Sequence, residues 1–246
     1  MSAEWPDSGR GLLKPGRSGY KASLFMIAKR SGLMERILFF EPHLRDKSVL
    51  AHDPFKALIA PRPIGWISTM DKAGQVNLAP YSFFNAFSSE PPLIGFCSEG
   101  AKDSLSFARD GGEFVWNLAT YDLRNEMSLS SAPLPRGDSE FVHAGLETAP
   151  SQLVRPPRVA ISPAAMECKL TQIIQLKDMD GKDMPRFLVL GQVVMIHIAD
   201  RYVRDGMIHV TEMKPLARCG YQDYTVLDEV FALKRPAGGG NSVGGG

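Results

Sequence analysis

The sequence predicts a mainly β fold of the α+β class, in which seven strands form a barrel with a few short helices. Three observations support this prediction. After residue 34 the apolar runs are short and β-rich, the segments between them are dense in Gly, Pro and Asp, and only two runs have helical spacing. The predicted strands span residues 64–70, 76–79, 92–98, 113–119, 166–176, 187–198 and 207–213.

The first predicted strand lies in the segment ALIAPRPIGWISTMD, residues 57–71. Because proline fixes φ and removes a backbone donor, Pro61 and Pro63 keep the chain extended until the strand begins at about residue 65. Side chains alternate along a strand, so Ser68 and Thr69 point to opposite faces. The segment is therefore either a buried strand with locally satisfied hydroxyls or one wall of a binding site.

Two segments carry helical patterns. In KDSLSFARDGG, residues 102–112, Asp103 or Ser104 is the expected N-cap, and the glycine pair is the expected stop. In YDLRNEMSLSS, residues 121–131, apolar and small side chains recur on one helical face. We expect both helices to interrupt the strands of the barrel.

Familiar catalytic and nucleotide-binding motifs are absent from the sequence. No GxGxxG follows a predicted strand, GxxxxGK[ST] and HExxH do not occur, and the GxSxG match at residues 240–244 lies in the Gly-rich tail and not at a strand-to-helix turn. KDMDGKD, residues 177–183, resembles the start of an EF-hand loop, but the twelfth position counted from Asp178 is Val189 and not glutamate. We interpret this segment as a polar hairpin turn and expect no metal site.

Composition and charge narrow the class of protein. The 246 residues suit one large domain, and 44% hydrophobic with 22% charged residues are ordinary for a globular protein. The net charge of +1 gives no field that would attract nucleic acid or an acidic membrane. No run approaches the roughly 18 apolar residues of a transmembrane helix. We expect neither a nucleic-acid partner nor a membrane partner.

The cysteines indicate a reducing compartment, so we expect a cytoplasmic protein. Cys97, Cys168 and Cys219 are odd in number and form neither a CxxC pair nor a His-rich cluster, which argues against disulfides and zinc. Cys97 lies in the apolar strand LIGFCS, where a thiol is either inert core or a redox group. We favour inert core.

The ends of the chain differ in composition from its centre. Residues 1–33 are basic and contain a single apolar patch, SLFMIA, which fits either a flexible extension or a transit-like segment. Residues 237–246 are a Gly-rich tail of low complexity. We favour a flexible extension, one domain over residues 34–236, and a flexible tail.

The segment EGAKDSLSF combines a glycine turn, Lys102 and the start of a predicted helix. Exposed N–H groups and the positive end of the helix dipole attract anions, and the lysine adds a full charge. The segment therefore predicts either a phosphate site or an ordinary capped helix with a solvated lysine.

The order of five segments resembles the flavin reductase-like family, whose members, including flavoredoxins, adopt an FMN-binding split β-barrel. The resemblance covers roughly residues 50–230. It rests on APRPIGWIST, NLAPYSFFN, PPLIGFCS, KDSLSFARDGGEFVWNLA and, more weakly, PLARCGYQDY. Several matches in the expected order are more specific than any single motif.

This resemblance implies where the ring of a flavin would lie. Arg62, Pro63 and Trp66 would border the isoalloxazine, although Trp66 could equally belong to the core. Ser68 and Thr69 would offer hydroxyls to the polar edge of the ring or to the ribityl chain. Such a site needs a flat apolar wall, scattered donors and a cationic end.

The resemblance also implies positions for the rest of the cofactor. The ribityl chain would run beside Asn77, Ala79, Ser82 and Phe83, with the Ala79 and Ser82 backbones as donors. The phosphate would be held by Ser98, Lys102, Asp103 and Ser104, with the Asp103 carboxylate capping the helix. His209 would approach the flavin from a partner chain, or else lie in the core or at the rim of the barrel.

The function implied is that of a homodimeric, non-covalent FMN flavoprotein that accepts hydride from NADH or NADPH. The flavin carries the chemistry, so we predict no catalytic side chain. Electrons would then pass to a free flavin, a monooxygenase partner or iron. The alternatives are a flavoredoxin-like electron carrier without nicotinamide oxidation, and a barrel that has lost its flavin and serves as an interaction module.

Overall fold

The computed structural model describes residues 23–30, 33–135 and 137–234. The chain divides into two compact units, residues 1–54 and residues 55–246. The first 22 residues and the Gly-rich tail lie outside the described residues, so the predictions made for those ends remain predictions.

The first unit contains a β-hairpin that crosses the boundary expected near residue 33. Strand β1 (Ser23–Arg30) pairs antiparallel with β2 (Leu33–Phe39), and a 3₁₀ turn, η1 (Pro42–Leu44), follows. The first unit ends at Pro54, and the single domain expected over residues 34–236 stays a prediction.

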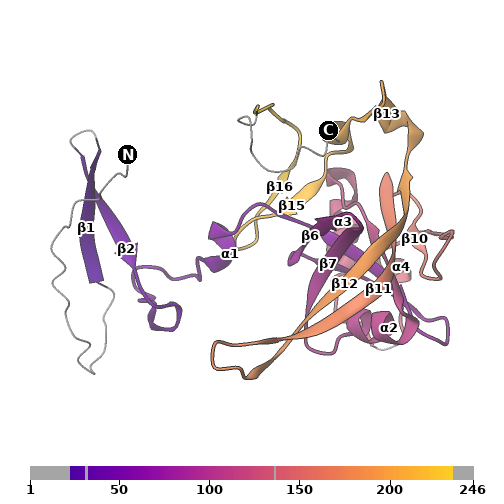
Figure 1. Ribbon diagram of the computed structural model, residues 1–246, viewed down its shortest axis with the longest axis horizontal. Helices are drawn as coiled ribbons and strands as arrows, with labels where there is room; N and C mark the ends of the chain where they lie inside the picture. The colour runs from indigo at the N-terminus through magenta and orange to yellow at the C-terminus, as the bar shows by residue number, and fades with distance from the viewer. Residues whose placement is uncertain (1–22, 31–32, 136, 235–246) are drawn as a thin grey trace, which may run out of the picture. The chain divides into compact units, whose positions relative to one another are not determined.

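The second unit is built on one curled antiparallel sheet that forms a split β-barrel (Figure 1). Its seven strands run in the order β5-β4-β8-β11-β12-β7-β6. Their bounds are β4 (Gly65–Met70), β5 (Val76–Tyr81), β6 (Phe84–Ser89), β7 (Pro92–Glu99), β8 (Glu113–Asn117), β11 (Ala164–Lys177) and β12 (Asp183–Ile198). The predicted mainly β fold class is confirmed.

Short helices and small strand pairs surround this sheet. The helices are α1 (Phe55–Leu58), α2 (Asp103–Gly111), α3 (Arg124–Leu129) and α4 (Glu140–His143), with 3₁₀ turns η2 (Tyr121–Leu123), η3 (Asp200–Tyr202) and η4 (Val210–Met213). The remaining strands are β3 (Arg62–Pro63), β9 (Thr148–Ala149), β10 (Arg158–Val159), β13 (Val203–Arg204), β14 (Met207–Ile208), β15 (Leu216–Arg218) and β16 (Tyr224–Val226).

The first six predicted strands are confirmed, and the seventh is wrong. Only Met207–Ile208 of residues 207–213 is extended, because the chain then turns into η4 and Lys214 follows with a φ of 51°. Strand β6 was missed. A β-bulge between Ala86 and Ser88 breaks the alternation of its side chains, so it lacks the period-two pattern of a strand.

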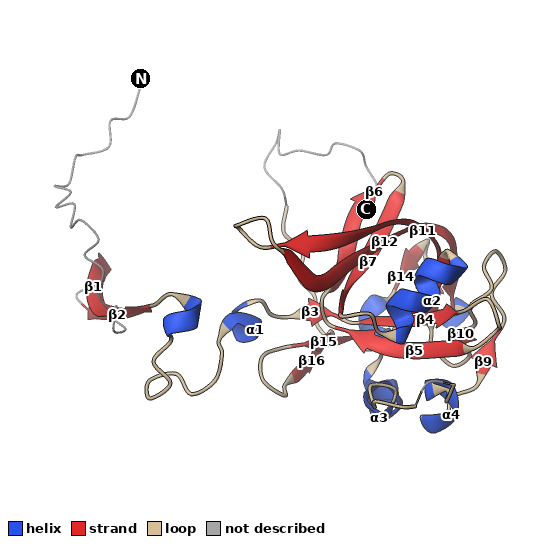
Figure 2. Ribbon diagram, turned by 90° about the horizontal axis from the view of Figure 1, so that it is seen from below, coloured by secondary structure: helices blue, strands red, loops and turns tan. Residues whose placement is uncertain are grey.

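The two faces of β4 bury their side chains in separate cores. Trp66 packs with Leu78, Met127 and Phe141 beneath α3 and α4, whereas Ile67 packs in another cluster that includes residues of α2. Figure 2 shows α2 on one side of β5 and the α3–α4 pair on the other. Helix α3 and the turn before it confirm the second predicted helix. Helix α2 on one side of β5 and helices α3 and α4 on the other form two walls beside this strand.

Helix α2 confirms the first predicted helix, with a different cap. It begins at Asp103 and Lys102 is the N-cap residue, so neither Asp103 nor Ser104 caps it, and Lys102 makes no side-chain cap hydrogen bond. Gly112 ends the helix with a φ of 71°. A Cβ at Gly111 would lie 2.6 Å from the Met70 carbonyl oxygen, so this glycine allows the helix to pack closely on β4.

A fully buried carboxylate ties a long loop to the sheet. Glu167 on β11 accepts hydrogen bonds from the backbone N–H groups of residues 152–154 and lies 2.6 Å from His197 Nε2 on β12. Burial raises the pKa of Glu167, but the hydrogen bonds from Gln152, His197 and Leu153 outweigh burial and hold that pKa below its ordinary value.

We expect Glu167→Gln to destabilise the fold by about 1–3 kcal/mol, because an amide leaves buried donors without acceptors. Since the folded pKa of Glu167 is lowered, its contribution is complete above the unfolded pKa and is lost as pH falls through the folded value. Urea unfolding at pH 7 and at acidic pH measures both effects. Equal stability of variant and wild type at pH 7 would show that the buried carboxylate contributes nothing.

Candidate functional site

The largest of the described cavities, about 410 Å³, lies at the free edge of β5. Three segments distant in sequence build it: strand β5, the start of α2, and residues 130–134, which follow α3. Glu140, the first residue of α4, completes the wall. Because β5 is the last strand of the sheet, the backbone groups on its outer edge are available to other partners.

One buried hydrogen-bond network joins these segments. The Tyr81 hydroxyl is hydrogen-bonded to the hydroxyls of Ser98 and Ser104. The Asn77 amide lies 2.7 Å from Ser104 Oγ. When the Asn77 amide is oriented with its oxygen toward Ser104 and its nitrogen toward Glu140, both ends of the amide have hydrogen-bond partners. A satisfied network of this kind holds the cavity wall in one arrangement.

Backbone geometry along β5 determines which groups face outward. The Leu78 N–H donates to Glu140 Oε2 at 3.1 Å, so it points away from β4. Along an antiparallel strand, the backbone N–H groups of successive residues point alternately toward and away from the neighbouring strand. The N–H of Ala79 therefore faces β4. The expectation that the Ala79 backbone donates to a ligand stays a prediction. Pro80 occupies an outward position, where the lack of an N–H has no cost.

The electrostatics of the cavity are mixed. Lys102 and the first-turn N–H groups of α2 supply positive potential, whereas Asp103 and Glu140 supply carboxylates. Burial raises the pKa of Glu140 above its ordinary value, and hydrogen bonds from its own N–H and from Leu78 only partly offset this. Burial also raises the pKa of Tyr81, so its phenol stays protonated. The cavity can thus accept an anion at the start of α2 at limited electrostatic cost.

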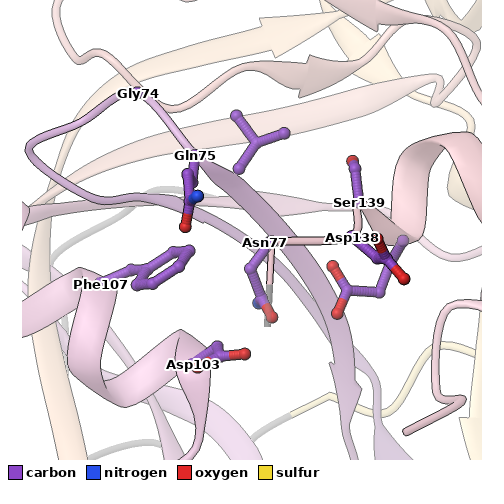
Figure 3. Close-up of a pocket in the computed structure, with 10 residues that line it drawn as sticks. Gly74, Gln75, Asn77, Asp103, Phe107, Asp138 and Ser139 are labelled. Atoms are coloured by element: carbon purple, nitrogen blue, oxygen red, sulfur yellow. The ribbon is translucent and has the colours of Figure 1, made fainter. Parts of the chain in front are cut away.

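Two smaller cavities adjoin the main one. The first, about 220 Å³, shares Asn77, Asp103 and Glu140 with it and continues past Phe107 to Asp138. Figure 3 shows the labelled side chains of Asn77, Asp103 and Asp138 around this space. The second, about 230 Å³, shares Pro80 and Ser131 with the main cavity. The three cavities share lining residues and so lie next to one another along β5, and we refer to them together as the groove.

The fold brings seven of the predicted site residues to this groove. Five line the main cavity: Asn77, Ala79, Lys102, Asp103 and Ser104. Arg62 and Ser82 line the 230 Å³ cavity beside it. These residues come from three separate segments of the chain, namely Arg62, residues 77–82 and residues 102–104.

Four other predicted residues are fully buried and line none of these cavities. Trp66 is core, and its Nε1–H donates to Ser130 Oγ at 2.9 Å. Ser68 donates to the Pro157 carbonyl, and Ser98 donates to the Gly100 carbonyl at 3.1 Å. Thr69 is buried with no partner for its hydroxyl among the described residues. Of the two alternating hydroxyls of the first strand, only that of Ser68 has a partner among the described residues, and the contacts expected of both with a flavin stay predictions.

Three further predicted residues lie outside the cavities. Pro63 is exposed on β3 and pairs with Ala217. Phe83 is 46% exposed, with the side chains of Lys56 and Arg62 each 6.0 Å from its ring centre. His209 begins η4, and its Nδ1 lies 3.8 Å from a Glu212 carboxylate oxygen. None of them contacts the main cavity of this chain.

Sequence reasoning missed Tyr81, Glu140 and the segment 130–134. Tyr81 could have been found, because alternation places it on the same face of the strand as Asn77 and Ala79. The other two are brought in only by the packing of α3 and α4 on the sheet, which leaves no local pattern.

Other site types find no support in the described structure. Among the described residues, no helix is long and apolar enough to cross a membrane. Within the same residues, no group of three His, Cys, Asp or Glu side chains is placed to hold a metal ion. The segment 177–183 is a hairpin turn, in which Asp178 Oδ1 accepts from the N–H groups of Asp180 and Lys182.

Comparisons with known proteins agree with the fold. The model of the flavin reductase like domain matches residues 58–215. A protein of Halalkalibacterium halodurans is 37% identical over 183 residues, which cover 72% of this chain and 87% of the relative. The chain therefore belongs to the flavin reductase-like family.

Solved structures extend this comparison. Nitrilotriacetate monooxygenase component B from Bacillus cereus superposes with a TM-score of 0.72 at 30% identity, over 80% of this chain and 98% of that protein. The 2-nitrobenzoate 2-nitroreductase of Pseudomonas fluorescens gives a TM-score of 0.66 at 26% identity, over 76% and 91%. This chain is similar to both along nearly the whole of their lengths.

Proposed function

We propose that this protein binds FMN in the 410 Å³ cavity and reduces it with NADH or NADPH. The observation that carries the proposal is the meeting of the α2 start, Lys102 and the Asn77–Ser104 pair in one cavity. Membership of the flavin reductase-like family supports a flavin-linked oxidoreductase. The donor set suits a molecule with an anionic end and a long polar chain.

In this proposal each wall has a defined role. The first-turn N–H groups of α2 and Lys102 hold the phosphate, because a helix start and a full positive charge both attract it. Asn77 and Ser104, already oriented by their network, bind the ribityl hydroxyls. Residues 130–134 cover the cavity opposite the helix and limit the access of water. Bound FMN supplies the hydride acceptor at its N5 atom.

FMN binding is the first test of this function. Flavin-free protein titrated with FMN should quench flavin fluorescence with saturation at one molecule per chain. The signal should be absent with the same concentration of adenosine monophosphate, which shares the phosphate and lacks the isoalloxazine. A linear, unsaturated response to FMN would contradict the proposal.

No thiol is expected to take part in the reduction. Burial raises the pKa of both Cys97 and Cys168, which disfavours the reactive thiolate form. We therefore expect simultaneous Cys97→Ala, Cys168→Ala and Cys219→Ala replacement to leave the rate of flavin reduction within about twofold of wild type. Anaerobic stopped-flow absorbance measures this rate on folded, FMN-loaded protein. A loaded variant that neither nicotinamide reduces would require a thiol relay in place of direct hydride transfer.

We further propose that the protein is a homodimer. Support comes from large apolar side chains that stay exposed on several strands, among them Phe87 of β6, Ile174 of β11, Ile196 of β12 and Met207 of β14. Light scattering should give twice the mass of one chain. A monomer that retains one FMN per chain would rule the homodimer out.

The electron acceptor would be a separate protein or a free flavin. The similarity to nitrilotriacetate monooxygenase component B supports a monooxygenase partner. A flavoredoxin-like electron carrier remains the competing proposal, and it predicts normal FMN binding without oxidation of either nicotinamide. Measuring NADH and NADPH consumption in the presence of excess FMN separates the two.

A further inference from the structure

The 230 Å³ cavity beside the candidate flavin site is strongly cationic. Lys56, Arg62 and Arg218 all line it, and no Asp or Glu is among its lining residues. Two aromatic side chains, Tyr221 and Tyr224, complete much of the remaining wall. The chain as a whole is nearly neutral, so this concentration of positive charge is local.

Arg62 is the buried centre of this cavity. It is only 7% exposed, and its two Nη atoms donate to the carbonyls of Lys56, Ile59 and Cys219. Its Nε–H is buried and has no acceptor among the described residues. These three carbonyls are neutral, and the described residues provide no carboxylate that pairs with the guanidinium. A buried charge without a counter-charge is costly, and a bound anion would remove that cost.

The fold places a second arginine directly opposite the first. Strands β3 and β15 pair antiparallel with Arg62 and Arg218 in register. Like charges at opposed positions of a sheet destabilise the pair unless something lies between or beside them. Arg218 is held in place by stacking at 4.4 Å from the Tyr224 ring centre.

A close backbone contact fixes this arrangement. A Cβ on Gly220 would lie 2.5 Å from the Ala57 Cβ, so only glycine lets the turn after β15 approach α1 this closely. The same approach brings the Cys219 carbonyl within 2.9 Å of Arg62 Nη2. The positions of the two arginines thus follow from the packing of β15 and its turn, and do not depend on a ligand.

The cationic cavity is adjacent to the candidate flavin site and separate from it. Asn77, Ala79 and Tyr81 of β5 line the main cavity and not the cationic one, whereas Ser82, the residue after β5, lines the cationic cavity and not the main one. Pro80 borders both. A molecule in the cationic cavity would therefore lie next to a flavin without using the Lys102 anion site.

We propose that this cavity binds the oxyanion group of a second, aromatic molecule, with Arg62 and Arg218 pairing to a carboxylate or phosphate. A guanidinium matches either oxyanion through paired N–H donors, and the two tyrosines offer an aromatic surface beside it. Electron exchange between this molecule and the flavin rests on the proposed function. The binding of the anion does not depend on that function.

The test is a titration of the ¹⁵N-labelled protein with benzoate and, separately, with inorganic pyrophosphate, followed by the Nε–H signals of arginine. We expect a saturable shift of the Arg62 Nε–H with at least one of these probes. The stronger probe distinguishes an aromatic acid from a nucleotide phosphate as the source of the oxyanion. Running the titration on flavin-free and on FMN-loaded protein separates this site from the phosphate site at Lys102.

Variants make the test specific. Arg218→Gln and Lys56→Gln should each weaken the stronger probe about tenfold or less, and their combination by more than either alone. Arg62→Met should abolish binding. This variant also leaves three carbonyls without a donor and so risks misfolding. If it does not fold, Arg218→Gln and Lys56→Gln still test the proposal. Arg201→Gln is the matched control, since Arg201 stacks on Tyr202 at 4.7 Å outside the cavity, and it should change nothing.

Three results would overturn the inference. The first is the absence of a saturable shift with either probe, and the second is equal binding by wild type, Arg218→Gln and Lys56→Gln. The third is loss of binding on loading with FMN, because the cavity would then be part of the flavin site. If FMN itself fails to bind while the anion still does, the proposed flavin function fails and the anion site stands.

Discussion

Replacing Lys102 with alanine is expected to weaken FMN binding about tenfold and to leave riboflavin binding almost unchanged. Lys102 is exposed at the mouth of the cavity and is the N-cap residue of α2, so its charge adds to the positive end of the helix. Riboflavin has no phosphate and gains nothing from that charge. Fluorescence titration of the two flavins against the same protein gives both dissociation constants.

Two further variants sharpen this measurement. Lys182→Ala removes the same charge from the exposed hairpin turn between β11 and β12 and should leave both constants unchanged. Glu140→Gln removes a carboxylate from the cavity wall and should strengthen FMN binding, the opposite sign to Lys102→Ala. Equal losses for FMN and riboflavin in Lys102→Ala would place the phosphate elsewhere.

Replacing Trp66 with alanine is expected to cost about 3–5 kcal/mol of folding stability. Trp66 is fully buried among Leu78, Met127 and Phe141, and its removal leaves a cavity that these neighbours only partly fill. Ser130 also loses the indole N–H as a donor. Urea unfolding followed by circular dichroism measures the loss.

Trp66→Phe separates packing from any direct contact with a flavin. It keeps an aromatic ring in the core, so it should cost about 1–2 kcal/mol and leave the spectrum of bound FMN unchanged. A shifted flavin spectrum in this variant, at full stability, would mean that the tryptophan contacts the ring after all. Stability close to wild type in Trp66→Ala would contradict the burial described above.

The fold was predictable from the sequence wherever local pattern and final environment agree. The strand at residues 92–98 and the helix ended by Gly112 are examples, because alternation and a glycine stop act over a few residues. Strand β6 was not predictable, since a bulge removes its alternation. A strand was predicted over residues 207–213 because this segment is rich in apolar residues. In the structure these residues pack at η4, where Met213 is buried, and do not form a long strand.

The candidate site was predictable to a lesser extent, for a related reason. Asn77 and Lys102 lie in segments whose structure is visible locally, as a strand and a helix start. Trp66 and Ser68 sit in an equally suggestive segment, yet burial assigns them to the core. Glu140 enters the cavity through a contact with Leu78, 62 positions earlier in the chain, and no local pattern records such a contact.

The most direct test of the central claim is the absorbance spectrum of FMN-loaded protein before and after anaerobic addition of NADH or NADPH. We predict that the oxidised flavin band bleaches with one nicotinamide at a rate proportional to the loaded protein, and returns on admission of oxygen. The Lys102→Ala variant should show the same bleaching once enough FMN is added to load it. A loaded protein whose flavin stays oxidised with both nicotinamides would contradict the reductase proposal.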